Sequence, residues 1–347
     1  MFAKTIPVIL QQNHWQKQFY NLNKLNFIFL FFISFILNGQ VILTTAETAF
    51  ESQVHFNPEI IKLNGIKKIT FEIIDKKDFE IAIDKNLIES YEFNTEGQLS
   101  RFYFTTVVKT IEKQIQYNKK KHKFRIVKEF IYDTISNNYF YSNKKLILNR
   151  YHDGSNYYES KYYRYDKNGN LTKELRFKET NVSNDKSIFI LGNQLLISQD
   201  SFQYQKYSNY QIKCIMLNNE NRPYKEQTID LDALGRKKKI NEHYTVAAWI
   251  MQQSIFEYNE KQIICAEFKG NANNNIALKN IYEYDIDKEL YSEKKFKNEM
   301  LYQEVSYVIN KSNKLLNSFI IRDLINKTLR IVKIKYDFSM LSKSDSK

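Results

Sequence analysis

The stretch "YRYDKNGNL", residues 163–171, has the pattern of a β-hairpin. Tyr163 and Tyr165 share one face of a strand, because successive side chains of a strand alternate between its two faces. Asp166 suits the first position of a type I turn, where its carboxylate bonds the backbone. Gly169 suits the fourth position, where φ is positive.

The residues after this turn predict a second strand with period-two alternation. Leu171, Leu175 and Phe177 are expected on an apolar face. Glu174 and Arg176 fall on the opposite, charged face. Such a ribbon is marginal alone in water, so it needs neighbours that cover its Tyr/Leu/Phe face.

The pattern aromatic-x-aromatic followed by Asp, Asn or Ser recurs along the chain. The Asp, Asn or Ser of this pattern, or the residue aligned with it, falls at positions 94, 142, 166, 208, 232, 259, 285, 310 and 337. From 208 onward the steps are 24 to 27 residues, which indicates a stacked repeat array. The first step, of 48, predicts a hidden copy near 118, and the step of 42 predicts an insertion around 178–193.

We therefore expect an all-β protein: a long antiparallel meander of repeated β-hairpins forming a curled or solenoid-like sheet, preceded by a short N-terminal signal helix. The expected organisation has four parts: a signal peptide with an extended n-region (1–39), an N-terminal cap of the array (40–90), YD-like hairpin repeats (91–339) and a disordered tail (340–347). Within the cap, "NPEIIKLNG" predicts a short helix that starts at Asn57-Pro58 and ends at Gly65.

The N-terminal segment predicts export. Residues 25–37 are apolar, Lys24 precedes them, and Gly39 offers a small residue for cleavage. The run is shorter than a membrane-spanning helix, so we expect a cleaved signal and a location in the periplasm or at the cell surface. The alternative is an uncleaved anchor that extends through 41–43, which would be the chain's contact with the membrane.

The formal charge is +13, but the lysines are scattered along the chain. The local basic runs at 119–123 and 236–239 are expected at solvated hairpin ends. We therefore expect no nucleic-acid partner.

The residues Tyr163, Tyr165, Asp166, Gly169 and Leu171 resemble the YD repeat of the Rhs-type family. That family forms β-hairpin spirals at cell surfaces or shells around toxin domains. The chain also resembles exported proteins of Bacteroidetes-type bacteria that carry degenerate versions of the motif. The resemblance covers roughly 91–338, implies no catalytic residue, and is incomplete because most copies lack the glycine.

Catalytic and metal-binding patterns are scarce in this sequence. No zinc-protease, nucleotide-binding or serine-hydrolase motif occurs, so we expect no enzymatic activity, no cofactor and no metal. His152 followed by Asp153 is the remaining candidate for a base and its orienting group, at a position where a turn is expected. Cys214 and Cys265 are expected to be separate buried thiols, because two repeats of strands place them roughly 19 Å apart.

A surface patch carries the candidate ligand-binding residues. Tyr158, Tyr162 and Arg164 share one strand face, where rings beside a guanidinium could stack on a sugar or on a partner's side chains, or where the tyrosines serve cross-strand packing alone. The first function we expect is a binding or scaffold module for a glycan, cell-wall polymer or protein partner. The alternatives are a toxin-associated immunity protein or toxin-shell fragment, and an enzyme with an unrecognised site.

Overall fold

The computed structural model describes residues 40–118, 123–185, 188–247, 249–260, 262–271 and 275–339. The expected signal peptide and its helix (1–39) and the expected tail (340–347) lie outside the described residues, and so does most of the basic run at 119–123.

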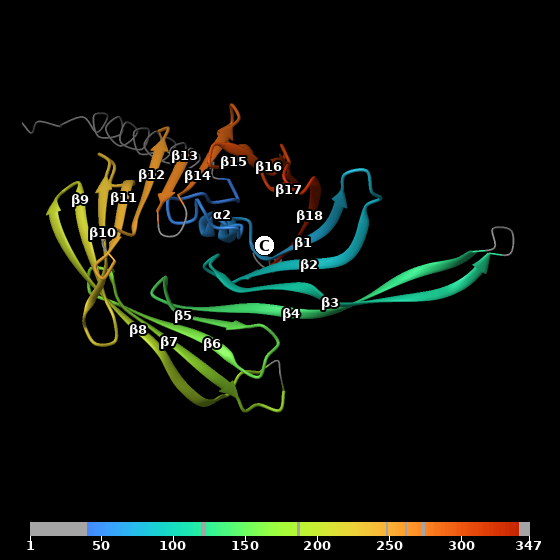
Figure 1. Cartoon of the computed structure of the whole chain (residues 1–347), viewed down its shortest axis with the longest axis horizontal. Helices are drawn as coiled ribbons and strands as arrows, with labels where there is room; N and C mark the ends of the chain where they lie inside the picture. Colours follow the sequence, from blue (N-terminus) through green and yellow to red (C-terminus); the bar gives the residue numbers. More distant parts are fainter. Residues whose placement is uncertain are drawn as a thin grey trace, which may run out of the picture. The chain divides into compact units, whose positions relative to one another are not determined.

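The described chain is almost entirely β-structure, which confirms the expected all-β class (Figure 1). It contains one short helix, α2, and eighteen strands: α2 (Pro58–Leu63), β1 (Ile66–Lys77), β2 (Ile83–Phe93), β3 (Leu99–Asn118), β4 (Lys123–Ser142), β5 (Lys145–His152), β6 (Tyr158–Tyr165), β7 (Leu171–Asn181), β8 (Leu191–Ser208), β9 (Gln211–Leu217), β10 (Pro223–Leu231), β11 (Lys237–Tyr244), β12 (Met251–Tyr258), β13 (Ile263–Gly270), β14 (Ile276–Tyr284), β15 (Leu290–Lys297), β16 (Met300–Ile309), β17 (Leu316–Asp323) and β18 (Thr328–Phe338). No helix in the described part of the chain has the length and apolar character needed to cross a membrane.

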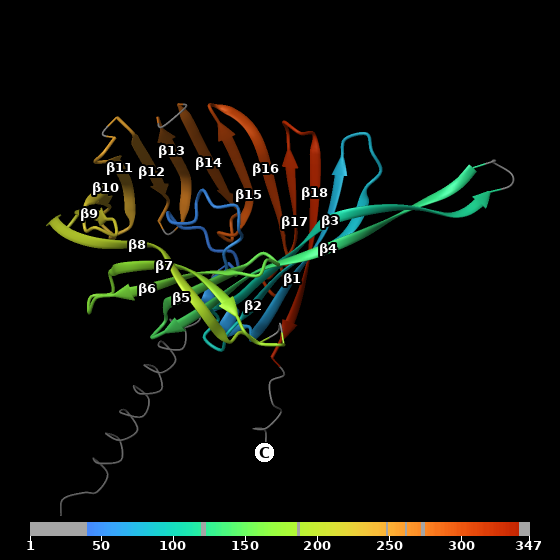
Figure 2. The ribbon, with the colours of Figure 1, turned by 60° about the horizontal axis from the view of Figure 1, so that its bottom comes forward.

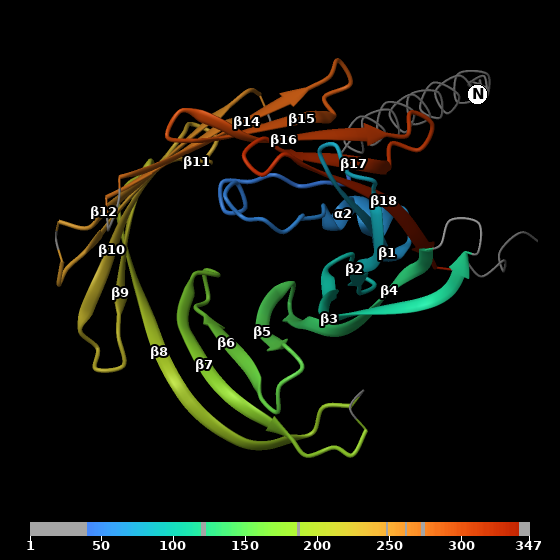
Figure 3. The same ribbon diagram turned by 45° about the vertical axis from the view of Figure 1, so that its right-hand side comes forward.

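The sheet closes on itself, so the predicted curled or solenoid-like sheet is wrong. Each strand pairs antiparallel with its neighbours in the chain, and β1 also pairs with β18 from Ile66↔Phe338 to Lys77↔Thr328. The result is an 18-stranded up-and-down barrel, seen as a ring in Figure 3. Closure removes both sheet edges, whose unpaired backbone groups would otherwise need another partner.

Eight of the nine aligned repeat positions open a hairpin turn at the same end of the barrel, and position 337 lies in β18 beside β1. In the turn after β6, Asp166 accepts bonds from the backbone N–H of Asn168 (2.9 Å) and Asn170 (2.8 Å), and Gly169 has φ +92°. Lys288 takes the same place in the turn after β14 with φ +64°. The predicted turn chemistry is therefore confirmed, with or without glycine.

These turns change the predicted faces of the strands that follow them. A bulge between Arg164 and Tyr165 of β6 shifts the register by one residue, so Tyr162 pairs with Leu175. Leu175 and Phe177 consequently lie on the face opposite to Tyr163. The single apolar face predicted for this hairpin is wrong, because one extra residue after the turn reverses every later side chain.

The irregular repeat steps have two causes. β3 and β4 are each 20 residues long and pair from Arg101↔Asn138 to Asn118↔Lys123, so in the described residues the step of 48 holds one long hairpin, in which position 118 ends a strand. This hairpin projects beyond the rest of the sheet in Figure 1. The insertion expected around 178–193 is confirmed: it lengthens the β7–β8 hairpin, whose described connecting residues are 182–185 and 188–190.

The segment 41–65 lies inside the ring of strands and forms a plug (Figure 3). Asn57 caps α2 by accepting a bond from the N–H of Glu59 (3.1 Å), as the sequence predicts. The ring centroid of Phe56 lies 4.8 Å from that of Tyr91 on β2, which is fully buried. The main core is therefore the contact between the plug and the inner wall of β1–β3 and β16–β18.

Cys214 and Cys265 are both buried and free, as expected. The register directs Cys214 inward, beside Tyr204, and Cys265 outward, beside Glu267 and Lys279. Burial raises the pKa of both thiols. Two thiols on opposite faces of the sheet, with three strands between β9 and β13, cannot form a disulfide.

Candidate ligand-binding groove

A groove of about 730 Å³ lies on the outer wall of the barrel, over β3 to β6 and beside the β7–β8 loop. Phe102 and Tyr139 pack on the inner core, so their chain neighbours Arg101 and Asn138 face outward. Arg150 pairs with Asn138 across β4 and β5 and therefore shares that outer face. The lining residues are Arg101, Thr134, Ser136, Asn138, Phe140, Arg150, His152, Gly154, Ser155, Asn156, Tyr158, Asn181, Ser183 and Phe189.

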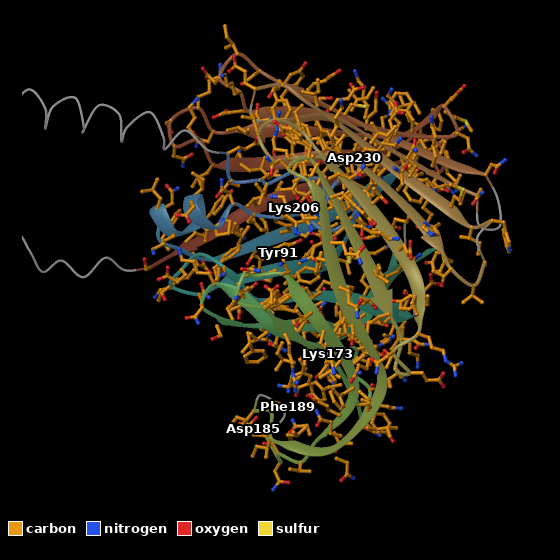
Figure 4. All side chains as sticks on the ribbon, turned by 90° about the vertical axis from the view of Figure 1, so that its left-hand side faces the viewer. Tyr91, Lys173, Asp185, Phe189, Lys206 and Asp230 are labelled. Atoms are coloured by element: carbon orange, nitrogen blue, oxygen red, sulfur yellow. The ribbon has the colours of Figure 1, made fainter. Side chains whose placement is uncertain are left out.

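Aromatic rings form one side of this groove. The rings of His152 and Tyr158 are stacked, with centroids 4.2 Å apart and planes inclined by 16°. Phe189 contacts Tyr158 edge-on at 4.9 Å and covers the guanidinium of Arg150, whose Cζ lies 3.6 Å from the ring centre. Figure 4 labels Phe189 and Asp185 together at the lower end of the sheet, away from the core residue Tyr91.

A buried polar network supports the floor of the groove. Glu179 of β7 is fully buried and accepts bonds from Arg150 Nε (3.0 Å) and from the Ser160 hydroxyl (2.5 Å) through Oε2. Its Oε1 accepts bonds from the Tyr162 hydroxyl (2.6 Å) and from Gln194 Nε2 (2.8 Å). Both carboxylate oxygens are satisfied, so Arg150 is held in one position by a pair that has little contact with water.

The network also sets the pKa values of its members. Burial alone would raise the pKa of Glu179, but the bonds from Ser160 and Tyr162 and the charge of Arg150 outweigh burial and lower it. The pKa of Tyr162 is raised by burial and by its bond to the Glu179 carboxylate. The carboxylate therefore stays ionised and the phenol stays protonated at neutral pH.

The three predicted ligand-binding residues share the outer face of β6, but they have different surroundings. Tyr158 lines the groove. Tyr162 lies outside its lining: its hydroxyl bonds Glu179 and its ring packs against Phe177 at 5.4 Å. Arg164 lies farther along β6, opposite Lys173 of β7. The role of these residues in binding stays a prediction.

The arrangement around His152 does not match a catalytic pair. His152 Nε2 lies 2.9 Å from the carbonyl of Ser155, and Asp153 accepts a bond from the N–H of Ser155. Hydrogen bonds from Ser155 are the main cause of the lowered pKa of Asp153. Asp153 thus shapes the turn after β5 and does not orient the imidazole.

Sequence reasoning missed the residues that build the groove, namely Arg101, Arg150, Glu179 and Phe189. They come from three strands and a loop, and only the closed register brings them together. One signal was present: Glu179 follows Leu175 and Phe177 at alternate positions. A carboxylate at the end of such an apolar run requires a buried partner when the run is covered.

A polar pocket of about 610 Å³ lies beside the β1–β2 and β17–β18 turns, where Asp75, Glu80, Lys85 and Arg330 line it. A cavity of about 260 Å³ lies inside the barrel between the plug and β14–β18, where Glu293 accepts a bond from Tyr307 (3.2 Å). In the described ranges, no group of three or more His, Cys, Asp or Glu side chains is arranged to hold a metal ion.

The chain has distant structural similarity to solved proteins. No protein-family model and no curated protein sequence matches it. It is similar to a porin-like protein from Bacteroides uniformis (10% identity, TM-score 0.36, 79% of this chain and 97% of that chain) and to one from Bacteroides vulgatus (9%, 0.29, 78% and 98%). A TcdB2–TccC3 chain matches with 10% identity and a TM-score of 0.22, over 70% of this chain and 15% of that chain. Similarity at this level does not establish a shared function, and the YD-repeat resemblance stays a prediction.

Proposed function

We propose that this protein is a non-enzymatic binding module of the cell envelope that holds an acidic glycan in the groove on its outer wall. One observation carries the proposal: the described lining combines aromatic rings with Arg101, Arg150, His152 and many amide and hydroxyl groups, and includes no carboxylate. The volume is typical of ligand sites. Aromatic rings pack against the C–H faces of sugars, amides and hydroxyls bond their hydroxyls, and the exposed guanidinium of Arg101 can pair with their carboxylates.

The rigidity of the groove supports the same function. Arg150 lies between Glu179 below and Phe189 above and is only 8% exposed, so it fixes the position of the Phe189 ring before any ligand arrives. The exposed guanidinium that a ligand carboxylate can reach is that of Arg101. Fixing the groove wall in advance reduces the entropy lost on binding.

We also propose that the barrel works in the aqueous part of the envelope. A barrel that contacts lipid carries an apolar band on its outer face. Here the outward positions carry cross-strand ion pairs, among them Lys213–Glu226 (2.6 Å), Lys279–Glu267 (2.8 Å) and Lys294–Glu283 (2.6 Å). Charged outer walls of this kind favour water over the bilayer core. Purification without detergent as a monodisperse protein would support this placement, and a requirement for detergent would oppose it.

The binding proposal is tested by titrating the protein with galacturonic-acid oligomers and with galactose oligomers of equal length. We expect preferential binding of the acidic series. Tyr158→Ala should weaken that binding at least about tenfold, while Tyr158→Phe, which keeps the ring, should retain it. Tyr210→Ala, an exposed tyrosine in the β8–β9 turn, is the matched control. Equal binding of both series, or equal loss in Tyr158→Ala and Tyr210→Ala, would refute the proposal.

A further inference from the structure

One end of the barrel carries a row of exposed apolar side chains. Five turns that are neighbours around the barrel, β11–β12, β13–β14, β15–β16, β17–β18 and β1–β2, lie along the upper edge of Figure 2. Each has at least one exposed large apolar residue at or beside its tip. We call this set the apolar rim: Phe79, Ile81, Val246, Trp249, Met251, Ile276, Met300 and Ile325.

The opposite end of the same strands has a different character. Its turns are the repeat turns, built on Asp, Asn and positive-φ residues. Leu234, Ile286 and Phe338 are exposed there, and so are Tyr207 and Tyr210 of the β8–β9 hairpin. Among the described residues of the β2–β3, β12–β13 and β16–β17 turns, no large apolar side chain is exposed. Around β11–β18, β1 and β2 the rim end therefore carries more exposed large apolar side chains than the opposite end, although the turn lengths are similar.

The apolar rim also carries unpaired positive charge. Among the acidic side chains of its turns, Glu80 pairs with Lys77 (3.6 Å), and Asp323 binds the backbone and side chain of Asn326. Asp323 keeps its charge because its partner Asn326 is neutral, and Asp78, Asp84 and Glu299 are exposed. Five lysines form no ion pair with any described residue: Lys76, Lys85, Lys269, Lys297 and Lys327. The rim thus combines apolar tips with five lysines at their bases, against four carboxylates of the same turns that have no cationic partner among the described residues.

We propose that the apolar rim docks onto an anionic lipid surface, with the tips entering the headgroup region and the lysines contacting lipid phosphates. Interfacial binding of proteins uses this combination of apolar insertion and basic residues. The tips belong to separate turns, and a fluid lipid surface can accept each tip individually. Trp249, which is 64% exposed, has the amphipathic ring that favours the headgroup level. Only the end of the barrel would contact the lipid surface, so the charged outer wall would stay in water.

The chain offers a direct spectroscopic test. It has two tryptophans, Trp15 and Trp249, so Trp15→Phe leaves Trp249 as the sole tryptophan emitter. We expect its emission to shift to the blue and to be quenched by shallowly brominated lipids when the full chain is mixed with phosphatidylglycerol/phosphatidylcholine vesicles. If the chain sediments with these vesicles while Trp249 is not quenched, or if it does not sediment at all, the proposal is overturned.

Matched variants separate the rim from the N-terminal apolar segment, because that segment is present in all of them. Phe79→Ser/Val246→Ser should lower the vesicle partition coefficient at least about tenfold. Leu234→Ser/Ile286→Ser, at the opposite end and similarly exposed, should leave the coefficient within about twofold of the unaltered chain. Equal losses in the two double variants would show that general surface hydrophobicity, and not the rim, controls binding.

Discussion

Replacing Glu179 by glutamine tests the buried network beneath the groove. The substitution keeps the shape of the side chain but removes the charge that Arg150 Nε contacts at 3.0 Å. Both partners are almost excluded from water, with exposed fractions of 0% for Glu179 and 8% for Arg150. Removing one member of a buried pair leaves the other charge uncompensated, which typically costs 3–5 kcal/mol.

We expect Glu179→Gln to lower the free energy of unfolding by about 3 kcal/mol, at the lower end of that range, because the bonds from Ser160, Tyr162 and Gln194 can rearrange around an amide. The assay is urea unfolding followed by circular dichroism at pH 7. The matched control is Glu267→Gln, which breaks the half-exposed pair with Lys279 and should cost about 1 kcal/mol or less.

The pH dependence follows from the lowered pKa of Glu179. A carboxyl group whose pKa is lower in the folded than in the unfolded protein stabilises the fold fully above its unfolded pKa. This contribution is lost as the pH falls through the folded value. The stability difference between the unaltered chain and Glu179→Gln should therefore be constant above about pH 5 and shrink below about pH 4. A difference under about 0.5 kcal/mol at pH 7 would refute the account of a strong buried pair.

Three further predictions concern the plug, the thiols and the outer wall. Gly97→Ala should lower the free energy of unfolding by more than its control does, because a Cβ there would lie 2.0 Å from the carbonyl oxygen of Pro58 in α2. The control Gly235→Ala has the same φ of +77° but open space around it, and should lower the free energy of unfolding by only about 1–2 kcal/mol. Equal losses in the two variants, measured by urea unfolding, would contradict docking of the plug against this turn. Cys214 and Cys265 should resist Ellman's reagent in the native protein and react in urea, because both thiols are buried and burial raises their pKa values. Fast labelling of the native protein would contradict this burial. Raising the salt concentration to 1 M should change the unfolding free energy by less than about 1 kcal/mol, because the outer ion pairs are partly open to solvent. A large loss would show that these pairs dominate stability.

Local chemistry explains how much of this fold could be predicted. Turn residues such as Asp166 and Gly169 act within five residues, so their spacing along the chain revealed the hairpins and their order. Closure could not be predicted, because it depends on the summed twist and stagger of eighteen strands and not on any one turn. The face of Leu175 and Phe177 was predicted wrongly because a bulge after a turn leaves no distinct mark in the sequence, yet it reverses the side chains that follow.

The candidate site shows the same limit. Tyr158 was identified from the composition of a single strand, and the structure places it in the groove. Arg101 and Phe189 lie 88 positions apart in the sequence and meet only through the pairing of β3 to β8. Motif searches cannot identify a groove that strand pairing assembles, because its residues do not recur at a fixed spacing along the sequence.

Hydrogen–deuterium exchange with and without an acidic oligosaccharide tests the central claim most directly, because it reports where the ligand sits on the barrel. We predict slower exchange in the β5–β6 turn at 153–157 and the β7–β8 loop at 182–190. Slower exchange confined to the plug at 41–65 and the inner wall, with no change in those two segments, would contradict a binding groove on the outer face.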